Sequence, residues 1–248
     1  MKTIQSIVKK KGYYQVSFDQ ETIHIHPDIL IKYHLSLQKS FDSKTFKSIM
    51  DDNDYLIYYE LAIGKLKKLM TRFEMKTYLI EKGANESIVK RILHDLESKR
   101  YINDLEYVKW FIALKKSTIG PKMMAYKLKQ KGIDFELVDQ MINQMDQTEE
   151  IKNLIQKKLS SLSQKSNHQK LISIKTYLLS KGFDTQTIDH YLSKLTFKDS
   201  DDQKLILRDY EKLKYKYRDL KGYELKDKIY QKLYQKGYTI DMIKKVIE

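Results

Sequence analysis

The stretch Leu128-Lys129-Gln130-Lys131-Gly132-Ile133-Asp134 decides the fold, because close copies of it occur at three other places in the chain. Counted from the glycine, every copy has Leu four residues before, Lys one residue before, and Asn, Asp or Thr two residues after. A β-branched aliphatic residue follows six residues after the glycine. The glycines that occupy this position are Gly83, Gly132, Gly182 and Gly237.

The spacing predicts a corner at which one helix ends and the next begins. Glycine adopts the left-handed conformation that ends a helix without a steric penalty from a Cβ atom. The Leu before it and the residue just after it are the two apolar positions that touch in a Schellman ending. The Asn, Asp or Thr that follows is a good N-cap for the next helix. We therefore interpret the four glycines as structural corners that carry no chemistry.

The corners recur at intervals of 49, 50 and 55 residues, which indicates a repeat protein. In such proteins each unit buries its apolar face against its neighbours. The predicted fold is mainly α, with tandem three-helix repeats that form an elongated curved array. The predicted repeats cover residues 54–99, 100–146, 147–198 and 199–248.

Residues 1–53 do not follow this pattern. Short runs of β-type residues at 4–8, 13–18 and 22–26 are separated by tight connections and predict a small N-terminal antiparallel sheet. Pro27 suits the first position of a helix, and residues 43–50 fit another short helix. His24 and His26 share one face of the third strand, but two histidines without a third ligand favour a structural role over a metal site.

Composition excludes several classes of protein. The chain has 248 residues and no cysteine, which rules out disulfides and thiolate metal sites. No run of eighteen apolar residues is present, and the first residues lack the apolar core of a signal peptide, so we expect a cytoplasmic protein without a membrane span. The phosphate-binding, dinucleotide-binding, serine-hydrolase and zinc-protease motifs are also missing from the sequence, so we expect neither a cofactor nor enzymatic activity.

The formal net charge of +14 suggests polyanionic partners. Residues 147–248 hold 22 basic and 14 acidic residues, so most of the excess lies there. An AT-rich coding sequence would also produce a chain rich in Lys, Ile and Tyr with only four Ala, so the total charge alone does not decide the matter.

A basic helix is predicted near residue 215. Lys212 and Lys216 form one i,i+4 pair and Lys214 and Arg218 form another, so the two pairs lie on stripes about 160° apart around the helix. Leu213, Tyr217 and Leu220 lie between the stripes and are expected to face the core. The basic residues of this region are Lys212, Lys214, Lys216, Arg218 and Lys221.

Several of these features together resemble the RecX family, bacterial regulators of the RecA recombinase whose repeats are three-helix units. The matching motifs are Thr71-x-x-Glu74-Met75-x-x-x-Leu79-x-x-Lys82-Gly83, then Tyr101-Ile102-Asn103-Asp104-x-x-Tyr107, Gly120-Pro121, and Leu128-x-x-x-Gly132-Ile133. The resemblance is strong over residues 54–140, and the N-terminal β segment and extra C-terminal units resemble the longer Gram-positive members. Arg100, Tyr107 and Val108 replace the Gly, Phe and Ala that are usual in the family.

The resemblance implies a monomeric protein that binds RecA, or its filament on DNA, and modulates it, usually by limiting recombinase, strand-exchange and ATPase activity. The alternative is a helical-repeat protein that binds single- or double-stranded nucleic acid without RecA. The candidate contacts with RecA or DNA are Arg72, Arg91, Arg100, Lys115, Lys116 and Lys122, together with Lys212, Lys214, Lys216, Arg218 and Lys221.

Overall fold

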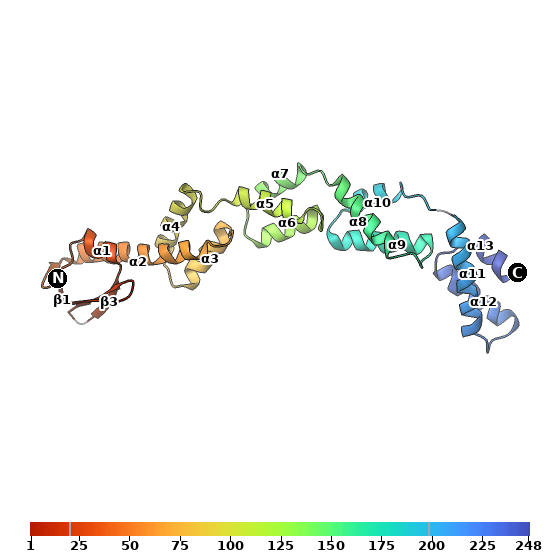
Figure 1. Cartoon of the computed structure of the whole chain (residues 1–248), viewed down its shortest axis with the longest axis horizontal. Helices are drawn as coiled ribbons and strands as arrows, with labels where there is room; N and C mark the ends of the chain where they lie inside the picture. Colours follow the sequence, from red (N-terminus) through yellow and green to blue (C-terminus); the bar gives the residue numbers. More distant parts are fainter. Residues whose placement is uncertain (20, 198) are drawn as a thin grey trace. The chain divides into compact units, whose positions relative to one another are not determined.

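The computed structural model describes residues 1–19, 21–197 and 199–248. The part of the chain that it describes is mostly helical and carries one small antiparallel sheet at the N-terminus, as predicted (Figure 1). The chain divides into two compact units, one of residues 1–109 and 128–137, the other of residues 110–127 and 138–248.

The sheet has the strand order β3-β2-β1-β4. Three strands match the predicted runs, whereas β4 is a two-residue pairing that was not predicted. Ile4, Val16, Phe18 and Ile25 are completely buried between the sheet and the helices that cover it. The strands are β1 (Lys2–Lys9), β2 (Tyr14–Phe18), β3 (Glu21–Ile25) and β4 (Ser40–Phe41), and helix α1 (Pro27–Lys32) begins at the predicted proline.

Helix α2 (Ser43–Lys65) corrects the prediction of a short helix over 43–50, because it continues into the first predicted repeat. The polar residues in its middle suggest a break, but tertiary contacts satisfy them. Asn53 is 1% exposed and accepts from the His26 backbone N–H, and its own amide donates to the His24 carbonyl. One helix therefore packs against the sheet with its first half and against α3 and α4 with its second half.

The remaining helices follow in groups of three, in keeping with the repeat fold. Buried clusters lie within α2–α4, within α8–α10 and within α11–α13. The boundaries of the four repeats remain a prediction. The helices are α3 (Arg72–Glu81), α4 (Glu86–Ser98), α5 (Asp104–Lys115), α6 (Pro121–Gln130), α7 (Phe135–Asn143), α8 (Thr148–Ser160), α9 (Asn167–Lys181), α10 (Thr185–Leu192), α11 (Asp199–Lys216), α12 (Gly222–Gln235) and α13 (Ile240–Ile247).

All four predicted corners have the geometry of a Schellman ending. The glycines have φ angles of 94°, 69°, 89° and 80° in chain order, all in the left-handed region. At the second corner the Ile133 N–H donates to the Leu128 carbonyl at 3.3 Å, and the Gly132 N–H donates to the Lys129 carbonyl at 2.9 Å. The other three corners repeat this pair of bonds. The next helix is capped in each case, by Asn85, Asp134, Asp184 and Thr239.

The corners also have a second role that the sequence did not reveal. Three of them hold the N-terminus of a helix from the preceding part of the chain, and we call each such contact a joint. In the first joint the Thr71 hydroxyl at the start of α3 donates to the Lys131 carbonyl at 2.7 Å. In the second, the Gly120 N–H before α6 donates to the Lys181 carbonyl at 2.7 Å. In the third, the Ser166 hydroxyl before α9 donates to the Lys236 carbonyl.

In each joint, atoms of the incoming helix occupy the space that a Cβ on the corner glycine would need. A Cβ atom built on Gly132 would lie 2.2 Å from Cγ of Phe73, and one on Gly182 would lie 2.5 Å from Cβ of Met123. At Gly237 the nearest atom would be Cδ2 of His168, at 2.3 Å. Glycine is thus required there twice, by the backbone angle and by the neighbouring helix.

The joints differ in how the first N–H of the incoming helix is satisfied. In the first, Asp104 accepts from the Arg72 N–H at 2.8 Å, and in the third Asp202 accepts from the Asn167 N–H at 2.9 Å. In the second joint the first helical residue is Pro121, which has no N–H. Gln147 stands there as far before its corner glycine as Asp202 does, and its amide donates to two carbonyls of the preceding loop.

Candidate functional site

The candidate basic residues fall into two groups, according to whether they are paired within the molecule. Arg72 Nε lies 2.7 Å from Glu97, and Lys116 Nζ lies 3.0 Å from Glu150. The Lys116 bond lowers the pKa of the Glu150 carboxyl, so this pair stays charged near neutral pH. Such pairs reduce the charge that these side chains present to a partner.

Arg91 ties α4 to the N-terminal part of the chain. Its guanidinium donates to Asp52 at 3.1 Å and lies 4.0 Å from the centroid of the Tyr55 ring. Asp52 also accepts from Lys32 and from the Tyr33 hydroxyl. Burial alone would raise the pKa of Asp52, but the bonds from these three donors outweigh it and lower that pKa to about 2. Arg91 therefore acts first as a structural tie, although it remains half exposed.

The structure explains Arg100, Lys115 and Lys122 in different ways. Arg100 has a φ of 57° directly after α4, which is the conformation that the Gly usual in the RecX pattern adopts without strain. Its side chain lines a shallow pocket with Tyr101 and Glu106. Lys115 is half-buried in the last turn of α5, and Lys122 is exposed. Hydrogen bonds from Thr187 are the main cause of the lowered pKa of Asp184, and the positive charge of Lys122 adds a smaller effect.

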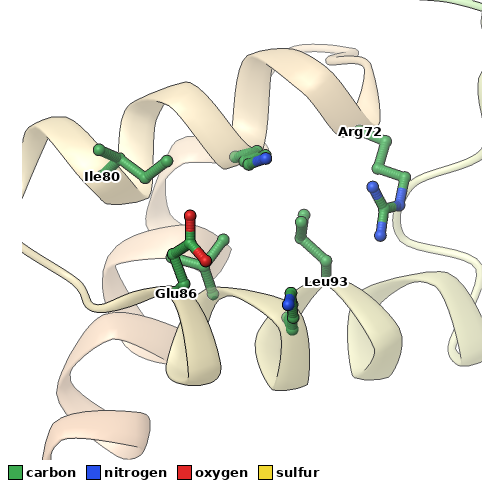
Figure 2. Close-up of a pocket in the computed structure, with 7 residues that line it drawn as sticks. Arg72, Ile80, Glu86 and Leu93 are labelled. Atoms are coloured by element: carbon green, nitrogen blue, oxygen red, sulfur yellow. The ribbon is translucent and has the colours of Figure 1, made fainter.

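A pocket between α3 and α4 brings Arg72 together with basic residues that were not predicted (Figure 2). Arg72 and Ile80 lie on α3, and Glu86 and Leu93 face them from α4. The floor is apolar and the volume is about 100 Å³, large enough for one side chain. The two further cations at its rim are Lys76 and Lys90, and Val89 completes the lining.

These two lysines are exposed and make no ion pair among the described residues. Their i,i+4 spacing from Arg72 and Glu86 places them along the pocket, a relation that the sequence could have suggested. An apolar floor under three cations and one carboxylate suits an acidic side chain that lies next to an aliphatic one.

The C-terminal basic residues lie on the surface of the protein. Lys212, Lys214, Lys216, Arg218 and Lys221 are all exposed, and none forms an ion pair with another described residue. Leu213 is 8% exposed and Tyr217 packs against the same core. Arg218 lies 5.0 Å from the ring centroid of Tyr215. Exposed cations without an ion pair therefore surround the end of α11.

The histidines of the sheet have structural contacts. His26 caps α1 and its Nε2 lies 3.0 Å from Glu60, while the His24 ring lies 4.4 Å from that of Tyr13. Within the described ranges no group of three His, Cys, Asp or Glu residues could hold a metal ion. Helices long and apolar enough to cross a membrane are likewise missing from the part of the chain that the structure describes.

Comparison with known proteins decides the family. The chain is 31% identical to the regulatory protein RecX of Oceanobacillus iheyensis over 230 residues, which is 89% of this chain and 84% of the relative. The chain belongs to the RecX family. A family model described as "RecX, third three-helix domain" matches residues 200–247, the α11–α13 group.

Other RecX proteins agree with this assignment. The regulatory protein RecX of Streptococcus equi subsp. zooepidemicus is 28% identical over 97% of this chain and 96% of its own. A crystal structure of RecX from Lactobacillus salivarius is 28% identical, with a TM-score of 0.55 over 58% of this chain and 97% of that one. A second RecX crystal structure shares the fold, with a TM-score of 0.62 and 22% identity over 79% of this chain and the whole of the other.

Proposed function

We propose that this RecX-family chain binds the RecA recombinase, or its filament on DNA, and modulates it by binding rather than by catalysis. The observation that carries the proposal is the 31% identity to a named RecX regulatory protein over 89% of the chain. The expected effect is inhibition of filament growth, strand exchange and ATP hydrolysis by RecA.

In this proposal one surface contacts RecA and a second surface contacts DNA. The pocket between α3 and α4, with its apolar floor and the rim of Arg72, Lys76 and Lys90, is suited to a carboxylate and an aliphatic group of a protein partner. The unpaired cations at the end of α11 are suited to the phosphates of the DNA that RecA covers. The alternative, nucleic-acid binding without RecA, would use the second surface alone.

The experiment measures RecA's ATP hydrolysis on single-stranded DNA with the full-length protein added at sub-stoichiometric and equal amounts. We expect hydrolysis to fall for the parent protein and to fall less for the charge-reversed variant Lys76→Glu/Lys90→Glu. Lys67→Glu is the control, because Lys67 is also exposed and lies in the same unit but outside the pocket. DNA binding without any effect on RecA would favour the alternative, and equal loss in Lys67→Glu would remove the pocket from the proposal.

A further inference from the structure

Helix α12 carries a stripe of tyrosines that the core does not use fully. Tyr223, Tyr230 and Tyr234 are seven and four residues apart, which places them within about 20° of one line along the helix. Tyr230 packs partly against the core of α11–α13, but Tyr223 is 84% exposed and Tyr234 is 59% exposed. The rings of Tyr230 and Tyr234 are parallel within 4°, with centroids 6.4 Å apart.

The stripe runs into a groove between α12 and α13. Tyr223 and Tyr230 line the groove with Lys226, Lys244 and Ile247, and its volume is about 310 Å³. Neither lysine forms an ion pair with a described residue. Two carboxylate residues also line the groove, and of these Asp227 accepts from the Gln231 amide at 2.8 Å while Glu248 lies at the end of the chain.

The charge of this part of the chain selects the kind of ligand. Residues 202–248 contain thirteen basic and eight acidic residues, and Arg218 and Lys221 lie just before the tyrosine stripe. A ring that is left 84% exposed in a basic unit offers a flat apolar surface next to cations. Bases of a single strand have free faces for such a ring, whereas bases in a duplex are already stacked on one another.

We propose that the groove between α12 and α13, together with the tyrosine stripe that leads into it, binds single-stranded nucleic acid. Tyr223 in the groove and Tyr234 farther along the stripe are the stacking surfaces, and Lys226 and Lys244 are the phosphate contacts. This site deepens the DNA contact of the proposed function, and it places base contacts on α12 rather than on the basic stripes of α11. Because stacking does not distinguish one base from another, the site binds without strong sequence preference.

The test uses fluorescence anisotropy with the full-length protein, a labelled oligo(dT) strand and an abasic strand of equal length, without RecA. Tyr223→Leu should weaken oligo(dT) binding roughly 5- to 100-fold and leave abasic-strand binding unchanged, because only the bases stack. Tyr223→Phe keeps the ring and should bind like the parent. Lys226→Gln/Lys244→Gln should weaken both strands and flatten the dependence of log affinity on log salt by about 1.4.

Phe135→Leu is the control, since Phe135 is 64% exposed at the start of α7 and far along the chain from α12. Circular dichroism checks that each variant remains folded. The proposal is overturned if the parent does not bind oligo(dT), if Tyr223→Leu binds both strands like the parent, or if Phe135→Leu weakens binding as much. Failure of the RecA assay with an intact Tyr223 effect would instead reject the proposed function and keep the site.

Discussion

The second corner offers the sharpest test of the joints, through the substitution Gly132→Ala. Two independent costs are expected. A non-glycine residue at a φ of 69° costs about 1–2 kcal/mol of unfolding free energy relative to glycine. In addition, the new Cβ would lie 2.2 Å from Cγ and 2.3 Å from Cβ of Phe73. The Cβ of Phe73 cannot swing away as a ring can, so the first turn of α3 must move.

The cost of that movement can be bounded from the contacts of the joint. Phe73 is half exposed, so losing its packing removes about half of the 1.5–3 kcal/mol that a fully buried side chain contributes. The bond from the Thr71 hydroxyl to the Lys131 carbonyl would also lengthen, at about 1 kcal/mol. We therefore expect a total loss of about 3–4 kcal/mol.

Urea unfolding followed by circular dichroism measures the loss, and the chain supplies its own controls. Gly222 has a φ of 57° and Gly12 a φ of 88°, but a Cβ on either would meet nothing within 4 Å. Gly222→Ala and Gly12→Ala should thus cost only the backbone term of about 1–2 kcal/mol. If Gly132→Ala proves no more destabilising than these two, the joint contributes nothing to stability.

Three further outcomes can be checked with single sets of variants. Asp52→Asn should destabilise the protein by about 2 kcal/mol at pH 7. The difference from the parent should disappear as the pH falls from about 4 to 2, because the lowered pKa of Asp52 stabilises the fold only while this carboxyl is ionised. A pH-independent difference in urea unfolding would contradict the tie to Arg91. Thr71→Val should lower the unfolding free energy by about 2–3 kcal/mol, because it removes both the cap of α3 and the bond to the Lys131 carbonyl. Thr239→Val removes only a cap and should lower it by about 1 kcal/mol. Equal losses in thermal unfolding would argue against the joint. The third set replaces five basic residues by Gln: Lys212, Lys214, Lys216, Arg218 and Lys221. It should weaken DNA binding and flatten the slope of log affinity against log salt by up to about 0.7 per lost phosphate contact. An unchanged slope would show that these residues are only solvated surface.

Much of the local structure could be predicted because it depends on neighbours in the sequence. The φ of Gly132, the cap by Asn85 and the capping box of Thr71 and Glu74 all follow from residues a few positions apart. The continuity of α2 could not be predicted in this way. Asn53 is stable inside a helix only because the backbone around His24 and His26 satisfies its amide.

The candidate site was less accessible to prediction from the sequence, because charge alone does not tell which cations are already paired. Arg91 is held by Asp52, which lies 39 residues earlier, and Arg72 is held by Glu97. Lys76 and Lys90 were not among the predicted contacts, since their role in the pocket depends on how α3 packs on α4. The tyrosine stripe of α12 was visible as spacing, but only the exposure of Tyr223 separates it from ordinary core packing.

The differing chemistry of the joints fixes the order of the modules. A helix that begins with Pro121 offers no N–H, so a corner that brings Asp202 to it would bury a carboxylate without its donor. The Asn167 N–H would in turn lose Asp202, which accepts from it in the present order. A gene in which the α8–α10 and α11–α13 segments were exchanged would therefore encode the same helices and the same corners, but the hydrogen-bonding groups at their joints would no longer match. Consensus repeats can be reordered or multiplied freely, whereas each of these three-helix groups fits only one neighbour.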